Sequence, residues 1–502
     1  MADQGASYRR ILKSSSIIGG ASVINIVIGL VRTKILAVLL GPAGVGLVGL
    51  YTGLMQTATT FASMGLGTVG TRQIAEAIGQ ENTRELAVAR RAMLWGSTLL
   101  AGVGALVVWS LRDLLAQYAL GSSEQASIVG WLSLGVALSV AGASQGALIQ
   151  GMRRIRDMAK LSVYGSVLNT VLGLALLYQW GSAGLVAYVL VGPLMSFLLG
   201  HWYVAYLPKS ETANITIQEM AHQWKVLLVL GIPFMGAGLV STLVQLWIRV
   251  EVGDRLGAEA LGHFQAAWMI SMQYIGFVLG AMVADFYPRL TGVINDHKAV
   301  TNLVNEQTEI ALLLSGPVFI VMIGLAPWVI HVLYSSDFLP AIELLRWQIL
   351  GDVLKVASWP LGFVILAAGA GKTFFCTESL VLLFMGSLIS GLLPVIGLRI
   401  TGIAFLVSYL VYLPLVYILA IRRVNFQWNN NIYGLLLAIL SACVLVFVLC
   451  SHYWWGGGVA ISLAVTFSIY SLLRLACMSN AGGSLNRIAT SAQRILTRFH
   501  SK

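Results

Sequence analysis

Long apolar runs, separated by short polar segments, make up most of the chain. Windows of about nineteen residues find fourteen such runs, and each approaches the ~20 residues that a helix needs to cross a bilayer. The runs fall near 14–40, 44–70, 92–111, 128–150, 161–180, 183–206, 226–250, 262–288, 307–330, 342–368, 373–396, 402–421, 431–450 and 457–477. They are continuous, whereas the strands of a membrane barrel are segments of about ten residues with alternating polarity. The pattern therefore predicts an all-α membrane protein with about fourteen transmembrane helices.

Composition agrees with this pattern. The 502 residues are 58% hydrophobic and only 10% charged, whereas a soluble domain is about a quarter charged because its surface must face water. The net charge of +11 does not indicate a nucleic-acid partner, because Lys and Arg cluster in short segments between the apolar runs. The first run continues to about Leu40 without a cleavage site, so no cleavable signal peptide is expected.

Basic residues gather on one side of the predicted membrane. If the N-terminus is cytoplasmic, Arg90-Arg91, Arg153-Arg154-Ile155-Arg156 and Arg422-Arg423 all fall on the cytoplasmic side. This is the bias that the positive-inside rule describes for bacterial membrane proteins. An even number of spans then places both termini in the cytoplasm.

Three short motifs recur at nearly constant spacing. Leu40-Gly41-Pro42-Ala43-Gly44-Val45-Gly46 opens the second run, and Leu256-Gly257-Ala258-Glu259-Ala260-Leu261-Gly262 opens the eighth, 216 positions later. Two further pairs are 218 positions apart, namely Gly151 with Gly369 at the ends of the fourth and tenth runs, and Gly184 with Gly402 at the starts of the sixth and twelfth. This repeat predicts two six-helix lobes related by a pseudo-twofold axis along the membrane normal, plus two extra C-terminal helices. Transporters use such designs and bind substrate at the repeat interface.

The repeat and the apolar runs together predict five segments. Residues 1–210 form an N-terminal lobe, 211–225 a cytoplasmic linker, 226–421 a C-terminal lobe, 422–477 two further spans, and 478–502 a cytoplasmic amphipathic tail. In this tail apolar residues recur at helical spacing while basic residues share another face, which is typical of an interfacial helix on anionic lipid. A frayed basic tail is the alternative.

Basic side chains inside the apolar runs are candidates for function, because a charge within a bilayer costs several kcal/mol. Arg32 lies nine positions before Gly41, about 13 Å from that helix end at 1.5 Å per residue, and either binds substrate or snorkels to the interface. Lys34 lies more than half a turn round the helix from Arg32, so only one of the two is expected to face a cavity directly. Arg249 occupies nearly the position of Arg32 in the second half.

Acidic side chains add further candidates. Asp285 is either an intramembrane proton or cation site or a cap at the cytoplasmic end of its helix. Asp352 and Lys355 are three positions apart and share a helix face, either as a structural ion pair or as a switchable pair that lines the cavity. Glu378 has no sequence neighbour with which to pair.

The remaining polar signals are weaker. Gln56 and Gln145 offer hydrogen bonds suited to sugars, although polar contacts between helices are the commoner role of such residues. Gly369-Ala370-Gly371-Lys372-Thr373 is not a phosphate loop, because Leu366 stands where that motif needs glycine and the segment joins two membrane spans. Neither the seven histidines nor the four cysteines have metal-ligand spacing, so no metal and no cofactor is expected.

Two segments carry a family resemblance. Gly29-Leu30-Val31-Arg32, followed by the run from Ile35 to Gly46, resembles the opening of the polysaccharide transporter family, which comprises the Wzx-type translocases of O-antigen and enterobacterial common antigen. Leu333-Tyr334-Ser335-Ser336-Asp337-Phe338, followed by Ala341, is similar to a recurrent segment of that family. The family is part of the multidrug/oligosaccharidyl-lipid/polysaccharide flippase superfamily.

The resemblance implies a V-shaped bundle of two lobes with a central cationic cavity that alternates between leaflets. Its substrate would be an undecaprenyl-pyrophosphate-linked oligosaccharide, moved from the cytoplasmic to the periplasmic leaflet. Arg32 matches an arginine with which the related lipid II flippases bind pyrophosphate. Those relatives place an acidic residue next, where Thr33 stands here, and this departure argues against a peptidoglycan precursor as substrate.

Specific residues follow from this function. A guanidinium offers a diphosphate bidentate hydrogen bonds that an ammonium cannot. The expected substrate-binding residues are Arg32, Lys34, Arg249, Lys355, Gln56 and Gln145. Uphill antiport would require a proton or sodium gradient, and the candidate ion-coupling residues are Asp285, Glu378 and Asp352.

Three other functions stay open. A multidrug extruder of the same superfamily would surround organic cations with acidic and aromatic groups, whereas the intramembrane charges here lean basic. A membrane-embedded polysaccharide polymerase or ligase would carry its catalytic residues on a large periplasmic loop, and the loops assigned to that side are short. A scaffold for envelope assembly is the third. We predict an inner-membrane transporter and not an enzyme, with the lipid-linked glycan, membrane lipids, and a polysaccharide polymerase with its chain-length regulator as partners.

Overall fold

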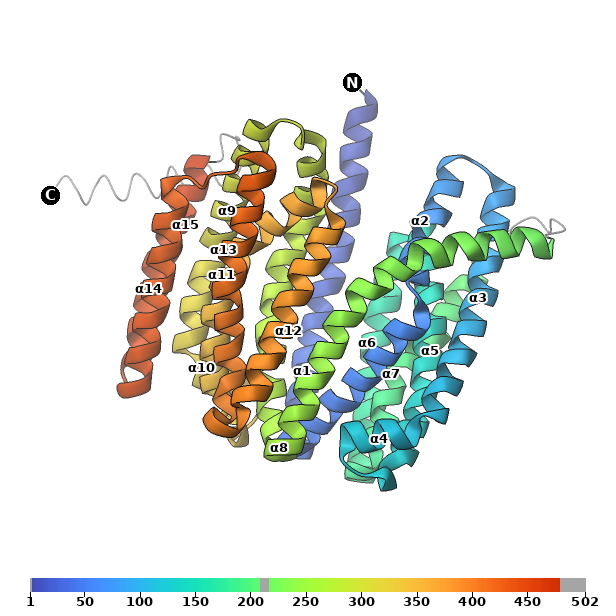
Figure 1. Cartoon of the computed structure of the whole chain (residues 1–502), viewed down its shortest axis with the longest axis horizontal. Coiled ribbons are helices and arrows are strands. Elements are labelled where there is room, and N and C mark those ends of the chain that lie inside the picture. The colour runs from blue at the N-terminus through green and yellow to red at the C-terminus, as the bar shows by residue number, and fades with distance from the viewer. Residues whose placement is uncertain (1, 208–215, 479–502) are drawn as a thin grey trace. The chain divides into compact units, whose positions relative to one another are not determined.

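The apolar runs are helices. The computed structural model describes residues 2–207 and 216–478, and within these ranges every regular element is an α-helix or a 3-10 helix (Figure 1). All fourteen predicted spans lie on these helices, and two of the spans contain a break. The run 44–70 is interrupted at Met64 and Gly65, which both have positive φ, and the run 307–330 is interrupted at Leu325. The predicted all-α membrane fold is confirmed.

The described helices have the following bounds. The first half of the chain forms α1 (Ala2–Ser63), α2 (Leu66–Gly79), α3 (Thr83–Ser110), α4 (Arg112–Leu120), α5 (Ala126–Gly151), α6 (Ile155–Trp180) and α7 (Leu185–Ala205). The second half forms α8 (Ile217–Val293), α9 (His297–Gly324), α10 (Ala326–Leu333), α11 (Ala341–Ala367), α12 (Gly371–Ile396), α13 (Ile400–Val424), α14 (Asn430–His452) and α15 (Gly456–Met478). Length and hydropathy alone mark nine membrane-crossing segments among the described residues, and some of these join two spans, as Ile155–Ala205 does.

The two halves repeat the same order of elements. Helices α3 and α9 each have 28 residues, and each is followed by a short helix, α4 after α3 and α10 after α9. Helices α6 and α12 each have 26 residues. Positions of positive φ recur 216 residues apart, at Gly41 and Gly257, Arg153 and Gly369, and Gly181 and Gly397. Because positive φ is rare and position-specific, this match means that both halves follow the same backbone path. The predicted internal repeat is confirmed, but its offset is 216 at all three positions, so Gly369 corresponds to Arg153 and not to Gly151 as the motif spacing of 218 predicts.

Equivalent caps begin equivalent helices. The Asn82 side chain accepts a hydrogen bond from the N–H of Glu85 at 3.0 Å before α3. The Asp296 side chain accepts from the N–H groups of Lys298 and Ala299, at 3.0 and 3.1 Å, before α9. Asn and Asp are favoured here because their oxygens satisfy N–H groups that have no partner within the helix. Both helices therefore begin in polar sequence, well before their apolar runs.

Two glycines divide the longest helices. Helix α1 breaks at Gly41 (φ 62°, ψ −172°), and α8 breaks at Gly257 (φ 86°, ψ 171°). Glycine adopts this backbone conformation easily because it has no Cβ. Pro42 follows the first break and suits the opening turn of a helix, where its missing N–H has no partner to lose. Each break separates two predicted spans within one helical element.

The segments after these breaks cross at very close range. A Cβ on Gly46 would lie 2.6 Å from the carbonyl oxygen of Ala258, and a Cβ on Gly262 would lie 1.9 Å from that of Pro42. The contact is reciprocal, because Gly46 and Gly262, like Pro42 and Ala258, are equivalent positions of the repeat. Only glycine lets the two backbones approach this closely.

By packing, the chain forms two compact units. Unit 1 comprises Met1–Gly262 with Leu333–Asp337, and unit 2 comprises His263–Val332 with Phe338–Lys502. The seventh span, in the first part of α8, therefore packs within unit 1, although the repeat assigns it to the second half. The repeat describes the path of the chain, whereas the units describe which helices pack together.

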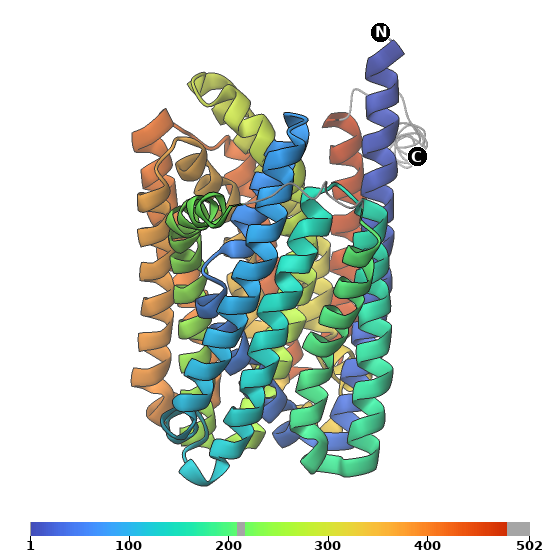
Figure 2. The same ribbon diagram turned by 90° about the vertical axis from the view of Figure 1, so that its right-hand side faces the viewer.

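Helix α5 is the centre of unit 1. It packs against α2, α3 and α7, and Figure 2 shows α3, α5 and α7 running side by side. The first turns of α8 lie across α2 and α3 (Figure 1). Arg84 pairs with Glu219 at 2.8 Å, and Trp224 Nε1 donates to the carbonyl of Ala92 at 3.0 Å. Polar contacts thus hold the start of α8 on unit 1.

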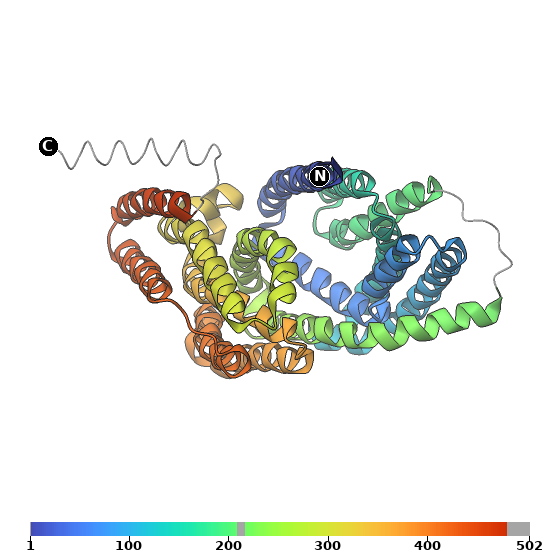
Figure 3. The same cartoon turned by 90° about the horizontal axis from the view of Figure 1, so that it is seen from above.

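Helix α11, the repeat equivalent of α5, is the centre of unit 2. It packs against α9 and α13, and most of its side chains are buried. Helices α14 and α15 pack on α9, and Figure 3 shows them end-on at the edge of this unit. Large apolar side chains on α14 and α15, such as Leu437 and Val465, are exposed, as expected of helices that face lipid.

Two predicted segments lie partly outside the described residues. Of the predicted tail 478–502, only Met478 lies within the described residues. Of the predicted linker 211–225, the described part begins at Thr216. The rest of that linker is helical, because α8 already begins at Ile217.

Candidate functional site

Polar side chains from four helices meet inside unit 2. Helices α8, α11 and α13 each supply two residues at i, i+3 spacing, which places both on one helix face, and α12 supplies one. We call this group the unit-2 cluster, and it consists of Ser271, Tyr274, Asp352, Lys355, Glu378, Tyr409 and Tyr412.

Asp352 is the most buried charged group of the cluster. Its side chain has no exposed surface, and its Oδ2 accepts hydrogen bonds from Ser271 Oγ and Tyr274 OH, both at 2.6 Å. Such short distances are typical of hydroxyl donors to a carboxylate. Within the described part of the chain, the second oxygen, Oδ1, is buried without a hydrogen-bond partner. One carboxylate oxygen is therefore fixed, and the other can take up a proton or a cation.

Lys355 places its ammonium against aromatic rings. Its Nζ is 5.6 Å from the ring centroid of Phe405 and 5.8 Å from that of Tyr409, and 3.6 Å from Met272 Sδ. Cation–π contacts of this kind stabilise a desolvated ammonium. Asp352 attracts Lys355 electrostatically, but within the described ranges the two form no ion pair at 4 Å or less. Of the two alternatives for this pair, the closed structural ion pair is not formed in the described structure, where Ser271 and Tyr274 are the hydrogen-bond donors to Asp352.

Glu378 finds its partner in another helix. The hydroxyl of Tyr412 on α13 donates to its carboxylate, and the charge of Lys355 attracts it electrostatically. The side chain is partly buried. Glu378 therefore extends the cluster from α11 to α12.

The cluster can bind a proton or a small cation. With all groups ionised, it carries two negative charges and one positive charge. Removing each ion from water costs several kcal/mol, so the proton affinity of one carboxylate depends on the position and charge of the others. Because these groups lie on four helices, a shift of one helix would change that affinity. The arrangement is therefore suited to coupling ion binding to helix movement.

Arg32, in the first part of α1, has different surroundings. It is partly buried, and within the described ranges it forms no hydrogen bond or ion pair. Its charge acts on the Tyr188 phenol of α7, and about two helical turns earlier Asn25 donates to Ser162 of α6 at 2.6 Å. Packing on α6 and α7 thus positions Arg32, and a guanidinium has five N–H donors.

The other two basic candidates of unit 1 have partners within the protein. Lys34 Nζ donates to the carbonyl of Tyr334 and so ties the segment Leu333–Asp337 to α1. Arg249 is 9% exposed and lies over Gly53 of α1, where an added Cβ would be 3.4 Å from its Nη1. Both side chains stabilise the packing of unit 1, and in this they differ from Arg32.

The predicted amide and acidic candidates are divided between the units. Gln56 is exposed on α1. Gln145 is 4% exposed and packs against Gly200 of α7, where a Cβ would lie 2.3 Å from its Oε1. The backbone of Asp285 belongs to α8, but its side chain lies outside the described residues. Of the predicted site residues, only Asp352, Lys355 and Glu378 come together in the unit-2 cluster.

Sequence reasoning missed the hydroxyl groups of this cluster. Ser271 and Tyr274, like Tyr409 and Tyr412, are polar residues three positions apart within apolar runs. The pair Asp352 and Lys355 has the same spacing, so a search for such pairs in several spans would have found all three.

The described residues contain no group of three or more His, Cys, Asp or Glu side chains placed to hold a metal ion.

Comparison with known proteins identifies the family. A family model described as polysaccharide biosynthesis protein matches residues 35–343, which is more than half of the chain. The chain belongs to the polysaccharide biosynthesis protein family. The match includes the repeat motif after Leu40 and the segment from Leu333 to Phe338 that carried the resemblance.

Two relatives of this chain are flippases. The lipid III flippases of Escherichia coli (strain K12) and Shigella flexneri are each 23% identical to it over 416 residues, which cover 80% of this chain and 96% of each relative.

Solved structures share its fold. An inward-facing multidrug resistance MATE family transporter of the MOP superfamily matches with a TM-score of 0.68 and 17% identity, over 80% of this chain and 98% of the other. The lipid II flippase MurJ, in an inward closed conformation, matches with a TM-score of 0.68 and 14% identity, over 92% and 99%. The fold is therefore that of the MOP superfamily transporters.

Proposed function

We propose that this protein is a flippase that moves an undecaprenyl-pyrophosphate-linked oligosaccharide, of the O-antigen or common-antigen type, from the cytoplasmic to the periplasmic leaflet by alternating access. The family and the lipid III flippase relatives support a lipid-linked glycan as substrate. The observation that carries the proposal is Arg32, a partly buried guanidinium of α1 without an ion pair in the described chain.

The chemistry of the substrate explains this arrangement. A diphosphate group carries about two negative charges and accepts bidentate hydrogen bonds from a guanidinium. The polyprenyl tail can stay in lipid during transport, so only the polar head needs a path through the protein. Arg32 is the principal ligand of the diphosphate in this proposal, and Lys34 and Arg249 set the packing of the helix that carries it.

The unit-2 cluster is the proposed ion-coupling site. Asp352 has one fixed and one unpartnered oxygen in the described structure, and Glu378 accepts a hydrogen bond from the Tyr412 hydroxyl. Protonation or cation binding at either carboxylate changes its attraction to Lys355. The energy of an ion gradient can thus alter the packing of α8, α11, α12 and α13. Asp285 is the further candidate for this role.

The rival functions have less support. An extruder of organic cations matches the aromatic and acidic groups of the unit-2 cluster, but the Lys355 ammonium already lies against the Phe405 and Tyr409 rings. An external cation would have to displace it. A polymerase or ligase finds no support among the relatives, which are flippases.

The proposed direction of transport requires a defined orientation. We place the protein in the bacterial inner membrane with both termini in the cytoplasm, because the basic clusters then obey the positive-inside rule. Single cysteines at the exposed positions Gln80 and Glu124, in a background without the native cysteines, test this placement. Labelling of intact cells at Glu124→Cys alone is expected, and labelling at Gln80→Cys would reverse the orientation.

Substitution of Arg32 tests the flippase proposal. A lost charge-assisted contact costs about 1.5–3 kcal/mol, or roughly 10- to 150-fold in binding. Arg32→Ala should therefore abolish complementation of a flippase-deficient strain while the protein still inserts into the membrane. Arg32→Lys should rescue it in part, because the charge is kept but the bidentate fork is lost.

Arg399 provides the control for this experiment. It forms an exposed ion pair with Glu343 at 2.8 Å, and exposed pairs contribute little, so Arg399→Ala should be nearly silent. Normal surface polysaccharide with Arg32→Ala would show that Arg32 only anchors α1 at the interface.

A further inference from the structure

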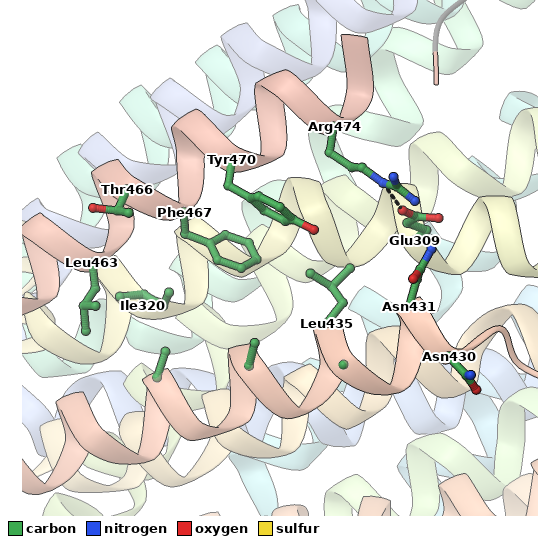
Figure 4. Close-up of a pocket in the computed structure, with 13 residues that line it drawn as sticks. Glu309, Ile320, Asn430, Asn431, Leu435, Leu463, Thr466, Phe467, Tyr470 and Arg474 are labelled. Carbon is green, nitrogen blue, oxygen red and sulfur yellow. Dashed lines mark hydrogen bonds and ion pairs between the residues drawn. The ribbon is translucent and has the colours of Figure 1, made fainter. Parts of the chain in front are cut away.

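Helices α9, α14 and α15 of unit 2 line an open cavity of about 620 Å³, which we call the groove (Figure 4). Its two ends differ chemically. At one end Arg474 Nε pairs with Glu309 at 2.7 Å, close to Asn431. The rest is mainly apolar, with the Phe467 ring reaching from α15 into the space, and Thr466 and Tyr470 of α15 add two hydroxyl groups to the lining. The cavity is thus amphipathic along its length.

Small residues make up most of the wall formed by α14. Gly434, Ala438 and Ala442 follow one another at four-residue spacing and line the cavity, and Leu435 is the one long apolar side chain that this helix adds to the lining (Figure 4). From Asn430 to Ala442 the wall is about 18 Å long, at 1.5 Å per residue. One leaflet contributes about 15 Å of hydrocarbon, half of the bilayer core. The groove therefore has the length of a single acyl chain.

The polar end lies where a lipid headgroup would be. Asn430 begins α14, Arg474 is four residues before the end of α15, and Glu309 begins the apolar run of α9. All three positions are at the membrane boundary that the charge bias predicts to be cytoplasmic. The neighbouring faces of α14 and α15 carry exposed apolar residues such as Leu437 (69% exposed), so the groove meets lipid and not cytosol.

We propose that this groove binds one phosphatidylethanolamine molecule of the cytoplasmic leaflet, with an acyl chain along α14 and its headgroup at the Glu309–Arg474 pair. The phosphate accepts from the Arg474 guanidinium, which is 37% exposed at the side chain, and the primary ammonium donates to Glu309. A quaternary ammonium has no N–H to donate, which excludes phosphatidylcholine. An anionic headgroup without an ammonium is repelled by Glu309, which excludes phosphatidylglycerol.

Lipid retention measured by native mass spectrometry tests this proposal without reference to transport. The full-length protein is exchanged into detergent with equal amounts of phosphatidylethanolamine, phosphatidylcholine, phosphatidylglycerol and undecaprenyl phosphate. We expect one retained phosphatidylethanolamine. Ala438→Trp fills the groove and should reduce this retention at least tenfold, whereas Leu437→Trp, on the lipid-facing side of the same turn, should leave it unchanged.

The headgroup contacts provide a second and independent test. Arg474→Gln leaves the apolar wall intact and should lower phosphatidylethanolamine retention about tenfold, the effect of losing one charge-assisted contact. Glu309→Gln should abolish the preference over phosphatidylglycerol. Thermal unfolding in the same detergent verifies that each variant is folded, and if Ala438→Trp is not, Arg474→Gln decides. Unchanged phosphatidylethanolamine retention in a folded Ala438→Trp or Arg474→Gln, or loss of undecaprenyl phosphate instead of phosphatidylethanolamine in these variants, would overturn the proposal.

Discussion

Arg32 and Lys355 are both basic residues within apolar helices, but their environments differ. Arg32, in unit 1, is partly buried, and in the described ranges it makes no hydrogen bond or ion pair. Lys355, in unit 2, lies against two aromatic rings and interacts electrostatically with Asp352 and Glu378. Both side chains carry the same formal charge, so the difference lies in what surrounds them.

This difference separates two uses of a charge within a membrane protein. A charge compensated by neighbouring side chains belongs to the fold, and removing any member leaves the others buried without a partner. A charge without internal compensation contributes little to the fold and can be compensated by a ligand. Substitution in the unit-2 cluster should therefore lower stability more than substitution of Arg32 does. Substitution of Arg32 should instead weaken ligand binding more.

The largest expected effect is on stability at Asp352. Asp352→Ala leaves the Ser271 and Tyr274 hydroxyls without their acceptor and removes the carboxylate that attracts Lys355, and breaking such a buried set costs about 3–5 kcal/mol. Arg32→Ala should change the free energy of unfolding by less than about 0.5 kcal/mol, because no internal partner is lost. Unfolding transitions of both variants in one detergent measure this contrast. Equal destabilisation by the two substitutions would remove the distinction between the two regions.

The second effect concerns Lys34, which is basic but held within unit 1. Lys34→Met removes the donor to the Tyr334 carbonyl, and a charged hydrogen bond contributes about 1.5–3 kcal/mol. Amide exchange at 333–337, followed by mass spectrometry, should accelerate about tenfold or more. Lys372→Met, at an exposed position, is the control and should leave this segment unchanged. Unaltered exchange in Lys34→Met would mean that other contacts hold the segment.

The third effect is on ion coupling. Glu378→Gln keeps the shape of the side chain but removes its charge, so transport should lose its dependence on the ion gradient and slow about tenfold, the effect of about 1.4 kcal/mol. Flipping in proteoliposomes with and without an imposed gradient measures this. Glu343→Gln, in the first turn of α11, removes an exposed carboxylate and should retain coupling. A fully coupled Glu378→Gln would move the coupling site elsewhere in the protein.

The smallest effect concerns pH at the start of α8. Hydrogen bonds from the Thr216 backbone and from Arg84 hold the pKa of Glu219 below its ordinary value. A lowered folded-state pKa stabilises the protein above the unfolded value of about 4.3, and this stabilisation is lost as the pH falls through the folded value. Amide exchange of the first α8 turn should be slower in wild type than in Glu219→Gln at pH 7, and the two should converge in acid. Glu124→Gln serves as the control.

Much of the fold could be predicted from the sequence. Apolar runs of membrane length specify helices because lipid satisfies no backbone polar group, and the motifs after Leu40 and Leu256 specify the repeat. The break at Met64 and Gly65 and the short helices α4 and α10 could not be predicted, because they depend on local backbone geometry within apolar sequence. The packing of the seventh span in unit 1 depends on contacts with α1, such as the hydrogen bond from Thr57 Oγ1 to the carbonyl of Thr242 at 3.2 Å, and the sequence shows both residues but not their contact.

The candidate site could be predicted only in part. Asp352 and Lys355 were found because they are close in sequence, and Glu378 because a charge in an apolar run is conspicuous. Their partners Tyr274 and Tyr412 come from helices that are 78 and 34 positions away. Tyrosine is also common in membrane helices for other reasons, so only the tertiary structure distinguishes these hydroxyls. The different environments of Arg32 and Lys34 likewise depend on which helices pack against α1.

The repeat also shows how its two copies have diverged under different constraints. At one equivalent position the second copy has Gly369 with φ 73°, whereas the first has Arg153 with φ 54°. A side chain in this conformation costs about 1 kcal/mol or more relative to glycine. Arg153 belongs to a basic cluster on the side predicted to be cytoplasmic, and such clusters determine how a membrane protein is inserted. The first copy thus keeps a side chain in a strained backbone conformation. The charge of this side chain acts while the chain is being inserted into the membrane, before the later spans have been synthesised.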